Sequence, residues 1–409
     1  MTNTAVMSAE EAIVALVNDP GVRADPYPAY ESVRAAGPAF QSSLGFWFVS
    51  SYAENARLMR HPDLVRQHGG SWELRGEMTG GTGRPWFEQQ GQFMLFLDPP
   101  DHTRIRGLVS RAFTPRYLQR LRPQIDERVH ELVEAFAEEK GGDLIDRLAL
   151  PLPMMVICDM LGVPAKDRES FRNWTVALAA TLEPFPSEEV QDRADAAIVA
   201  FIDYFKELVR DRRKNPSSDL LSALIEAEQA GERLNEHELI LTTVLLLAAG
   251  FETTTNLIGN GALALLCNRD QWTRLAEDPS RSPQAVEELL RYDSPVQLAT
   301  PRVARTSIDV EGGTLEEGDV MIPMVGAGNR DPKRFRNPNE LDVGRDDVVP
   351  LSFGGGPHFC LGAGLARIEG AALFGHLPRR LPSLELEDQE PRWRPTMNIR
   401  GLETLVVKV

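Results

Sequence analysis

The sequence has few cysteines, no excess of positive charge and no long uninterrupted apolar run. Cys158, Cys267 and Cys360 are spread over 409 residues without a CxxC pair, which indicates neither a disulfide framework nor a cysteine-based zinc site. This usage is typical of a reducing compartment, so we expect a cytoplasmic protein. The formal net charge is −16, whereas nucleic-acid binding needs a basic surface. Nucleic acid is therefore excluded as the main partner.

Targeting, membrane and linker segments are also lacking. The first twenty residues carry Glu10 and Glu11 beside a short apolar run and have no basic region, so a signal peptide is not indicated. The most apolar window, 239–251, ends at Glu252 and is shorter than the roughly 18 apolar residues of a membrane span. No repeat and no Ser/Pro/Gly-rich linker divides the chain. We predict a single domain over residues 1–409 and no membrane span.

Apolar residues recur at helical spacing along most of the chain. The clearest segments are 119–138, 187–213, 217–230 and 236–267. Short strand-like segments occur at 45–50, 302–310, 319–325 and 403–409, where β-branched and aromatic residues alternate with polar ones. The expected fold class is mainly α with small β-sheets.

A glycine-rich segment, 67–92, interrupts this pattern and is expected to be a long loop. It contains four large apolar side chains, Trp72, Met78, Trp86 and Phe87. Long loops in compact domains are usually functional, so we interpret the segment as a lid over a ligand pocket. The alternative is a surface excursion that its aromatic residues merely anchor.

The most informative stretch is FGGGPHFCLGAG, residues 353–364, in which one cysteine lies among glycines. Free cysteines are usually inert and buried, but here the glycines allow positive φ and close backbone approach. A helical pattern follows Cys360, and a helix N-terminus favours a thiolate. The sulfur could be a nucleophile with His358 as its base, although no third group orients such a pair. It could also be an axial ligand to haem iron.

The fixed positions of this stretch resemble the haem-binding loop of the cytochromes P450. Phe353, Gly354, Gly356, His358 and Cys360, followed by Gly362, match the pattern FGxGxHxCxG. The resemblance implies a haem b whose iron is bound by the Cys360 thiolate, with Phe353, Gly354 and Gly362 around it. It also implies the P450 fold, with the haem between the long central helix and the helix after the cysteine loop.

Within the long helix 236–267, the run AAGFETT at 248–254 introduces an acid and threonines into an apolar pattern. The helix could emerge into solvent here, but the apolar pattern resumes at Leu257. The run resembles the (A/G)Gx(D/E)T motif of the same family. That likeness implies that Thr253 assists dioxygen activation, Glu252 helps to deliver protons, Gly250 makes space, and Ala249 contacts the haem.

Two further patterns support the resemblance. Glu288 and Arg291 form an ExxR pair, which alone could be an ordinary solvated helix face; the family likeness adds Arg345 and implies a structural network. The run DPPDHTRIR at 98–106 places His102 and Arg106 on one helical face. Alone it could be a capped helix with a solvated pair. The likeness implies that both residues, together with Arg302 and His358, bind the haem carboxylates.

A haem monooxygenase needs electrons, and the chain has no flavin or nicotinamide fingerprint. We therefore expect a separate ferredoxin and ferredoxin reductase to deliver electrons from NAD(P)H, with O2 as co-substrate. The segment 102–125 has six arginines and no acidic residue. An acidic ferredoxin is expected to dock near Arg111, Arg116 and Arg367; a merely solvated helix face is the alternative explanation of the charges.

The substrate is expected to be a small lipophilic molecule of secondary metabolism, such as a polyketide-like, terpenoid or aromatic compound. The loop 182–187 is expected to close the pocket mouth. Hydroxylation is favoured over epoxidation, oxidative coupling and peroxygenase chemistry. A non-enzymatic haem sensor would not need the Glu252–Thr253 pair. The expected pocket residues are Met94, Phe96, Leu245, Ala248, Ala249, Val296, Leu298, Ala299 and Ile399.

Overall fold

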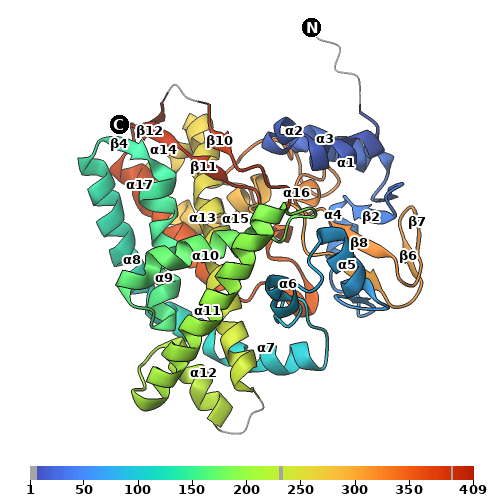
Figure 1. The fold of residues 1–409 in the computed structure, drawn as a ribbon. Helices are drawn as coiled ribbons and strands as arrows, with labels where there is room; N and C mark the ends of the chain where they lie inside the picture. The colour runs from blue at the N-terminus through green and yellow to red at the C-terminus, as the bar shows by residue number, and fades with distance from the viewer. Residues whose placement is uncertain (1–6, 230–233, 388–389) are drawn as a thin grey trace.

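The computed structural model describes residues 7–229, 234–387 and 390–409. Helices make up most of it, and short strands form small sheets toward one side and near the C-terminus (Figure 1). The expected fold class, mainly α with small β-sheets, is confirmed. The large hydrophobic core lies among the helices, and smaller apolar clusters join the sheets to the N-terminal helices.

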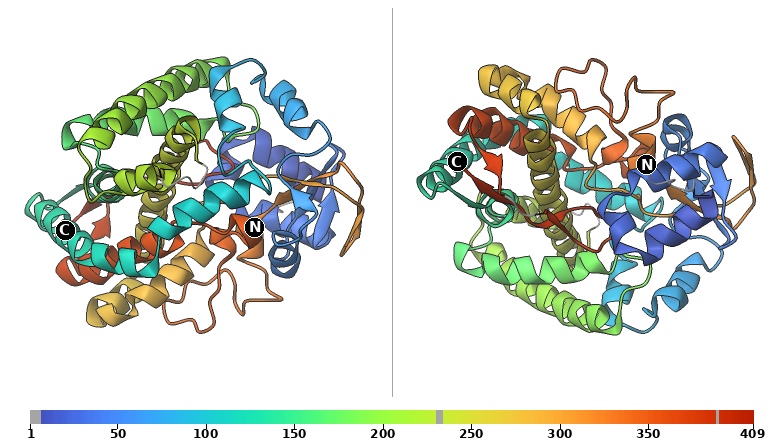
Figure 2. Two further views of the ribbon diagram at one scale, coloured as in Figure 1. Left: turned by 90° about the horizontal axis from the view of Figure 1, so that it is seen from below. Right: turned by 90° about the horizontal axis from the view of Figure 1, so that it is seen from above.

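Helix α13 (Glu236–Cys267) runs through the middle of the molecule (Figure 2). Its bounds are those expected from the sequence, and a capping box begins it: Glu238 N–H donates to Asn235 Oδ1 at 2.9 Å, and Asn235 N–H donates to Glu238 Oε2 at 2.9 Å. Among the described helices, only α13 is long and apolar enough to cross a membrane. Because 72% of that window is buried inside the protein, α13 has the burial of a core helix.

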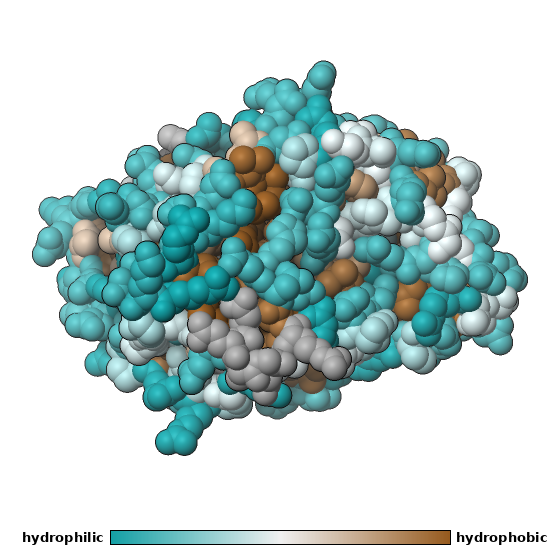
Figure 3. Space-filling view, turned by 60° about the horizontal axis from the view of Figure 1, so that its bottom comes forward, coloured by the Kyte–Doolittle hydropathy of each residue, from teal (hydrophilic) through white to brown (hydrophobic). Residues whose placement is uncertain are grey.

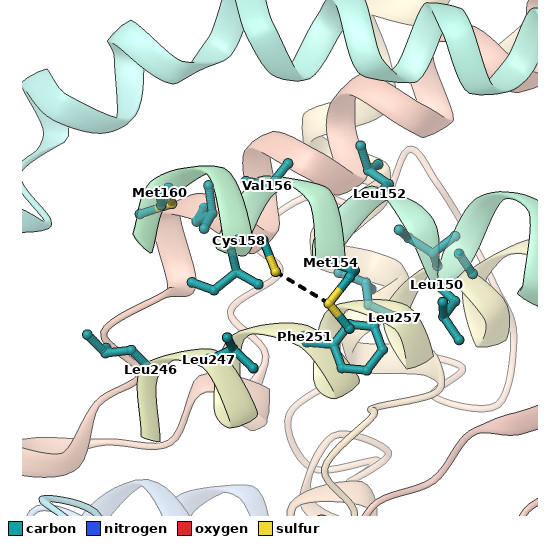
Figure 4. Close-up of a cluster of buried hydrophobic side chains, with 14 of the residues drawn as sticks. Leu150, Leu152, Met154, Val156, Cys158, Met160, Leu246, Leu247, Phe251 and Leu257 are labelled. Atoms are coloured by element: carbon teal, nitrogen blue, oxygen red, sulfur yellow. Dashed lines mark hydrogen bonds between the residues drawn. The ribbon is translucent and has the colours of Figure 1, made fainter. Parts of the chain in front are cut away.

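One side of α13 packs against α9 (Pro151–Leu161), as Figure 4 shows. Leu246, Leu247 and Phe251 of α13 meet the apolar side chains of α9. Cys158 is fully buried there, with its Sγ 3.6 Å from Met154 Sδ. Burial raises the pKa of the Cys158 thiol to about 12, so this cysteine is an inert core residue.

Other helices surround α13. Those in contact with it include α10 (Arg168–Ala180), α11 (Glu188–Lys214), α12 (Leu220–Gln229), α14 (Arg269–Glu277), α15 (Ser282–Tyr292) and α17 (Ala363–Arg380). The predicted helix 187–213 corresponds to α11, whose N-cap is Ser187. The predicted helix 217–230 corresponds to α12, and residue 230 lies outside the described residues. The remaining α-helices are α1 (Ala9–Asn18), α2 (Pro20–Ala24), α3 (Tyr27–Ala36), α4 (Tyr52–Leu58), α7 (Asp101–Ala112), α8 (Pro115–Glu138) and α16 (Val325–Gly328), besides two described below.

The largest sheet has the strand order β1-β2-β8-β5-β3. Its strands are β1 (Ala39–Gln41), β2 (Phe46–Val49), β8 (Val320–Pro323), β5 (Arg302–Ala304) and β3 (Leu64–Val65). Only β2 and β8 pair in parallel; the other pairs are antiparallel. The pairing of β3 with β5 brings Arg66, which follows β3, close to Arg302.

Two predicted strands are each divided into two in the structure. The segment 302–310 forms β5 and β6 (Ile308–Val310), and β6 pairs with β7 (Gly313–Leu315) in a separate hairpin. The segment 403–409 forms β11 (Leu402–Thr404) and β12 (Val406–Lys408). Strand β11 pairs with β10 (Arg392–Trp393), whereas β12 lies between β4 (Gly141–Asp143) and β9 (Glu385–Leu386). The polar residues Arg305, Thr306 and Ser307 separate β5 from β6, which is a local signal of the first break.

The prediction of a long loop at 67–92 is wrong. This segment contains two helices, α5 (Ser71–Thr79) and α6 (Pro85–Gln90). Gly70 and Gly80 adopt the left-handed conformation at the two ends of α5, so these glycines bound a helix. Trp86 and Phe87 are buried and Trp72 stacks on Phe87 with ring centroids 4.6 Å apart, while Met78 is 38% exposed.

A buried ion network joins α15 to the segment before the cysteine loop. Glu288 accepts two hydrogen bonds from Arg291, each 2.7 Å long, and two from Arg345 Nε, each 3.1 Å long. Both Glu288 and Arg291 are fully buried. Arg291 also donates to the carbonyl oxygens of Asn329, Pro338 and Glu340. Because removing one partner of a buried pair costs about 3–5 kcal/mol, these contacts fix the path of the chain from 329 to 345.

Candidate active site

The cysteine loop is a tight turn held by its own backbone. Cys360 N–H donates to Phe353 O at 2.9 Å, and Gly354 and Gly356 have φ values of 70° and 67°. A Cβ on Gly356 would lie 2.7 Å from Met59 O, so a side chain there would clash with α4's C-terminus as well as strain the backbone. The loop therefore requires glycine at this position, and α17 begins three residues after Cys360.

The Cys360 side chain is exposed, yet surrounding atoms desolvate its thiol. These two facts together place the sulfur in a recess of the protein. Burial raises the pKa of Cys360, while the N–H groups of Gly362 and Ala363 and the charges of Arg106 and Arg367 oppose the rise. Burial prevails, so the helix N-terminus alone does not make this thiol acidic. A cation bound to the sulfur would favour its thiolate form.

A cluster of arginine and histidine side chains lies beside this recess. Its members are Arg66, His102, Arg106, Arg302 and His358. Burial lowers the pKa of His102 to about 4 and that of Arg302 to about 10, and it also lowers the pKa of Arg66 and His358. The charges of the three arginines lower the pKa of both histidines further, whereas Asp98 raises the pKa of His102, Arg302 and Arg66.

Several polar atoms of this cluster have no hydrogen-bond partner. Both ring nitrogens of His102 and the Nε atoms of Arg66 and Arg302 are buried and unpartnered. The rings of His102 and His358 lie 4.2 Å apart between centroids. Buried cations and unpartnered donors are costly without an anion, so the residues fit a ligand that carries carboxylates beside the cysteine. A haem has these features, with iron for the sulfur and two carboxylates for the cations.

Arg106 connects the cluster to the cysteine loop. Its NH2 group donates to Phe359 O at 2.5 Å, and its charge acts on Cys360, His102 and His358. The cation cluster and the thiol are therefore neighbours. Arg106 thus contacts the backbone of the cysteine loop, besides sharing a helical face with His102.

The α13 turn at 248–253 is accessible although the helix is buried on both sides of it. Ala249 is exposed, and Ala248, Gly250 and Thr253 are partly exposed. At 100° per residue, Ala249 and Thr253 are about 40° apart and lie together to one side of the face that packs on α9. The residues of α13 before and after this turn are buried, so the helix does not emerge into bulk solvent here. The exposed residues of the turn therefore line a hollow inside the molecule.

Three successive threonines form the same local hydrogen bond but differ in surroundings. Thr253, Thr254 and Thr255 each donate through Oγ1 to the carbonyl four residues earlier, at 3.0, 3.3 and 3.1 Å. Thr254 and Thr255 are buried, whereas Thr253 is partly exposed. Of these three threonines, only Thr253 has its side chain on the accessible part of the 248–253 turn, where its hydroxyl could contact a small ligand.

Glu252 is 7% exposed and forms an ion pair with Arg394, Oε1 to NH1 at 2.7 Å. Its other oxygen, Oε2, is buried without a partner. Burial raises the pKa of Glu252, and Arg394 opposes this rise. A buried carboxyl group with one free oxygen and a raised pKa can act as a proton acceptor and donor.

Gly250 lies between α9 and the accessible turn. It is partly exposed, and a Cβ at this position would meet Ile157 Cδ1 at 3.4 Å, an ordinary contact distance. The role that the resemblance implies for Gly250, making space for a ligand, stays a prediction.

The expected pocket residues fall into two groups. Met94, Phe96, Leu245 and Leu298 are buried, while Ala248, Val296, Ala299 and Ile399 are partly exposed and Ala249 is exposed. Val296 and Ile399 form an isolated β-bridge, and Leu298 forms another with Met324. The structure thus brings 296–299 and the turn before β11 together from distant parts of the sequence.

A buried carboxylate fastens the α10–α11 connection, the expected mouth loop. Glu183 accepts hydrogen bonds from the N–H groups of Met397 and Asn398 at 2.8 and 3.0 Å, and Asn398 Nδ2 donates to Leu182 O. Phe185 of the same loop is 61% exposed and does not pack into the interior. The loop therefore lies against the 396–399 turn and is held by polar contacts.

The sequence analysis did not predict three residues of this region. Arg66 and Arg394 belong to no recognisable motif. The charged groups that act on them, Asp98 and Arg302 on Arg66 and Glu252 on Arg394, are far away in sequence. Glu183 lies in the segment LEPFP, which looks like an ordinary turn. Arg66 follows two buried strand residues, Leu64 and Val65, which is a weak signal of a charge at a sheet edge. The others required three-dimensional placement.

The sequence model of the cytochrome P450 family matches residues 46–281 and 282–401, and the chain belongs to this family. Its members are haem-thiolate oxidoreductases that use O2 and electrons derived from NAD(P)H. The motif-based resemblance is thus confirmed for nearly the whole chain. The family also implies a redox partner and a lipophilic substrate.

Similar proteins are bacterial cytochromes P450. Cytochrome P450 107B1 of Saccharopolyspora erythraea is 40% identical over 371 residues, 90% of each chain. The vitamin D(3) 25-hydroxylase of Pseudonocardia autotrophica is 37% identical and covers 94% of this chain and 93% of its own. The crystal structure of P450BioI, in complex with an acyl carrier protein ligated with hexadec-9Z-enoic acid, has a TM-score of 0.87 and 36% identity, with 96% of this chain and 100% of that chain covered.

We expect Arg394 to act as a positioning residue for Glu252. Because Arg394 lowers the pKa of Glu252, Arg394→Gln should raise that pKa further. Glu252 would then ionise only at higher pH, and the acid limb of the pH profile of product formed per electron consumed should move upward. Arg392→Gln, at an exposed neighbour bonded to Thr404, is the control and should leave the profile unchanged. Equal profiles in both variants would contradict the role.

Proposed function

We propose that the protein is a cytoplasmic haem-thiolate monooxygenase that inserts one oxygen atom of O2 into a small lipophilic molecule. The observation that carries this proposal is the recess of Cys360 beside buried cations whose donors have no anion. Cys360 would bind the iron, and His102, Arg106, Arg302 and His358 would hold the haem carboxylates. We add Arg66 to this set because its Nε is also buried and unpartnered.

The haem, when bound, supplies the redox chemistry that activates dioxygen. The chain's own residues provide the surroundings for it. Phe353 packs beneath Arg367, 4.4 Å from guanidinium carbon to ring centre, and would keep water away from the sulfur. Thr253 would donate a hydrogen bond on the open side of α13, and Glu252 would hold or release a proton at Oε2.

Hydroxylation is the favoured reaction. One relative is named as a 25-hydroxylase of vitamin D(3), and a structural neighbour holds a fatty acyl chain on a carrier protein. Both names concern lipophilic substrates, which agrees with the small and apolar residues at 248–249 and 296–299. Epoxidation, oxidative coupling and peroxygenase chemistry would use the same site, and product analysis with redox partners separates them.

The test that decides the function is the spectrum of the reduced, carbon monoxide-bound protein. We expect purified protein to be red and to show the long-wavelength band characteristic of thiolate-bound haem. Cys360→Ser should lose that band because a hydroxyl does not replace the thiolate. Cys267→Ser, at an exposed cysteine distant from the motif in sequence, should keep it. A band retained in Cys360→Ser, or wild-type protein without haem, would refute the proposal.

Thr253→Ala should uncouple electron use from product formation. Removal of the hydroxyl would leave no donor on the open side of α13, so reduced oxygen species should be released in place of product. A general acid–base contribution of this kind is worth roughly 10²–10⁴-fold, and we expect at least a tenfold lower product yield per electron. Thr255→Ala removes an equivalent but buried hydroxyl and should retain the yield. A similar yield in all three proteins would show that Thr253 has no such role.

We further propose an acidic ferredoxin as electron donor, docked near Arg111, Arg116 and Arg367. Arg367 is partly engaged, since its Nε and NH2 groups bond Glu287 at 2.5 and 3.0 Å. Arg116 is exposed, which makes it the better test. Arg116→Glu should slow reduction of the haem by an acidic ferredoxin at low salt, and the difference should diminish as salt increases. Lys166→Glu, at an exposed lysine outside the arginine-rich segment 102–125, should have no such effect; equal slowing in both would argue against the docking site.

A further inference from the structure

Outside the candidate active site, two histidines and a glutamate converge between α8 and α17. His130 and Glu134 are four residues apart on α8, so they lie on the same helical face. His376 lies on α17, which packs against α8 (Figure 1). One ligand atom from each of the three side chains lies within 4.8 Å of the other two. His130 is exposed, and the other two are partly buried, so solvent can reach the cluster.

The distances are close to those of a metal site. His130 Nδ1 is 3.5 Å from His376 Nε2, and His376 Nε2 is 3.9 Å from Glu134 Oε1. Bonds of roughly 2.0–2.2 Å in tetrahedral geometry separate neighbouring ligand atoms by roughly 3.3–3.6 Å. The imidazole pair already has this separation, and the carboxylate needs only a small movement to join it.

Arg380 contributes in two opposing ways. Its Nε donates to both oxygens of Glu134 at 2.8 and 3.0 Å, which orients the carboxylate as outer partners of metal ligands commonly do. Its positive charge also opposes a second cation nearby. The site should therefore bind a metal reversibly, with water completing the coordination.

We propose that His130, Glu134 and His376 bind a divalent transition metal ion of the zinc type and so fasten α8 to α17. Two imidazoles favour zinc-like ions over magnesium and calcium, which prefer oxygen ligands. The opposite end of α17 follows the cysteine loop, so the bound metal would hold in place the helix that begins beside Cys360. This role is independent of the proposed monooxygenase function.

Without metal, the same residues still join the two helices through the histidine contact and the Glu134–Arg380 ion pair. A purely structural cluster of this kind is the competing explanation. The two explanations differ in one measurable respect, because only a metal site binds zinc more tightly than the rest of the surface does.

The test uses the haem-loaded full chain without a histidine tag, so that neither a tag nor Cys360 competes for the metal. After treatment with EDTA and dialysis, the protein is titrated with zinc chloride against a fluorescent zinc chelator. His376→Gln and His130→Gln are compared with His237→Gln, which replaces an exposed histidine on α13. We expect wild type and His237→Gln to bind one zinc ion per chain, and both cluster variants to bind it at least tenfold more weakly.

Thermal unfolding followed by far-UV circular dichroism gives a second readout. Excess zinc should raise the unfolding midpoint of wild type and His237→Gln, because a ligand that binds only the folded state stabilises it. Neither cluster variant should respond. Equal zinc affinity in all four proteins, or no zinc bound by wild type, would overturn the proposal. An unchanged carbon monoxide spectrum verifies that each variant is folded and loaded with haem, whatever its affinity for zinc.

Discussion

Helix α13 must be buried along most of its length and yet leave one turn accessible, and this constraint shapes the rest of the molecule. The helix has 32 residues, and large apolar residues on the side that packs on α9 make close contact. To one side of that face, Ala249 and Thr253 leave the surface open. Helices α10 and α11 also contact α13, so a collapse of either helix onto that turn would close the hollow.

The charge distribution gives a second, independent indication of the same site. The buried Arg291 is compensated by an acid, Glu288, and by three backbone oxygens. The cluster around His102 instead concentrates cations against a single acid, Asp98. Burial of an ion without compensation costs several kcal/mol, so folding alone would not favour this arrangement. It is consistent with a dianionic ligand whose binding contributes to the stability of the folded protein.

The sequence indicated the family better than the long-range contacts of the site, for a physical reason. Cys360, Gly356 and His102 lie in short motifs that depend on local backbone geometry, so the adjacent residues are enough to recognise the motifs. The bounds of α13 were also predictable, because the capping box and the apolar run are local signals. Arg394 and Glu183 interact with residues 142 and more than 200 positions away, and no local pattern reports such pairs. Glycines at both ends of α5 were likewise misread, because the same residue serves loops and helix ends.

The turn between β10 and β11 contacts two parts of the site that are far apart in sequence, Glu252 on α13 and the 182–187 loop. Arg394 holds Glu252 on the central helix, and three to four residues later the backbone of Met397 and Asn398 holds Glu183 in the mouth loop. The charge of Glu183 also raises the pKa of Glu252, so the two acids interact. A movement of the 182–187 loop that carried Glu183 away would remove this repulsion and lower the pKa of Glu252. If this loop closes the pocket as we expect, access to the pocket and the protonation of Glu252 would be coupled through the turn between β10 and β11.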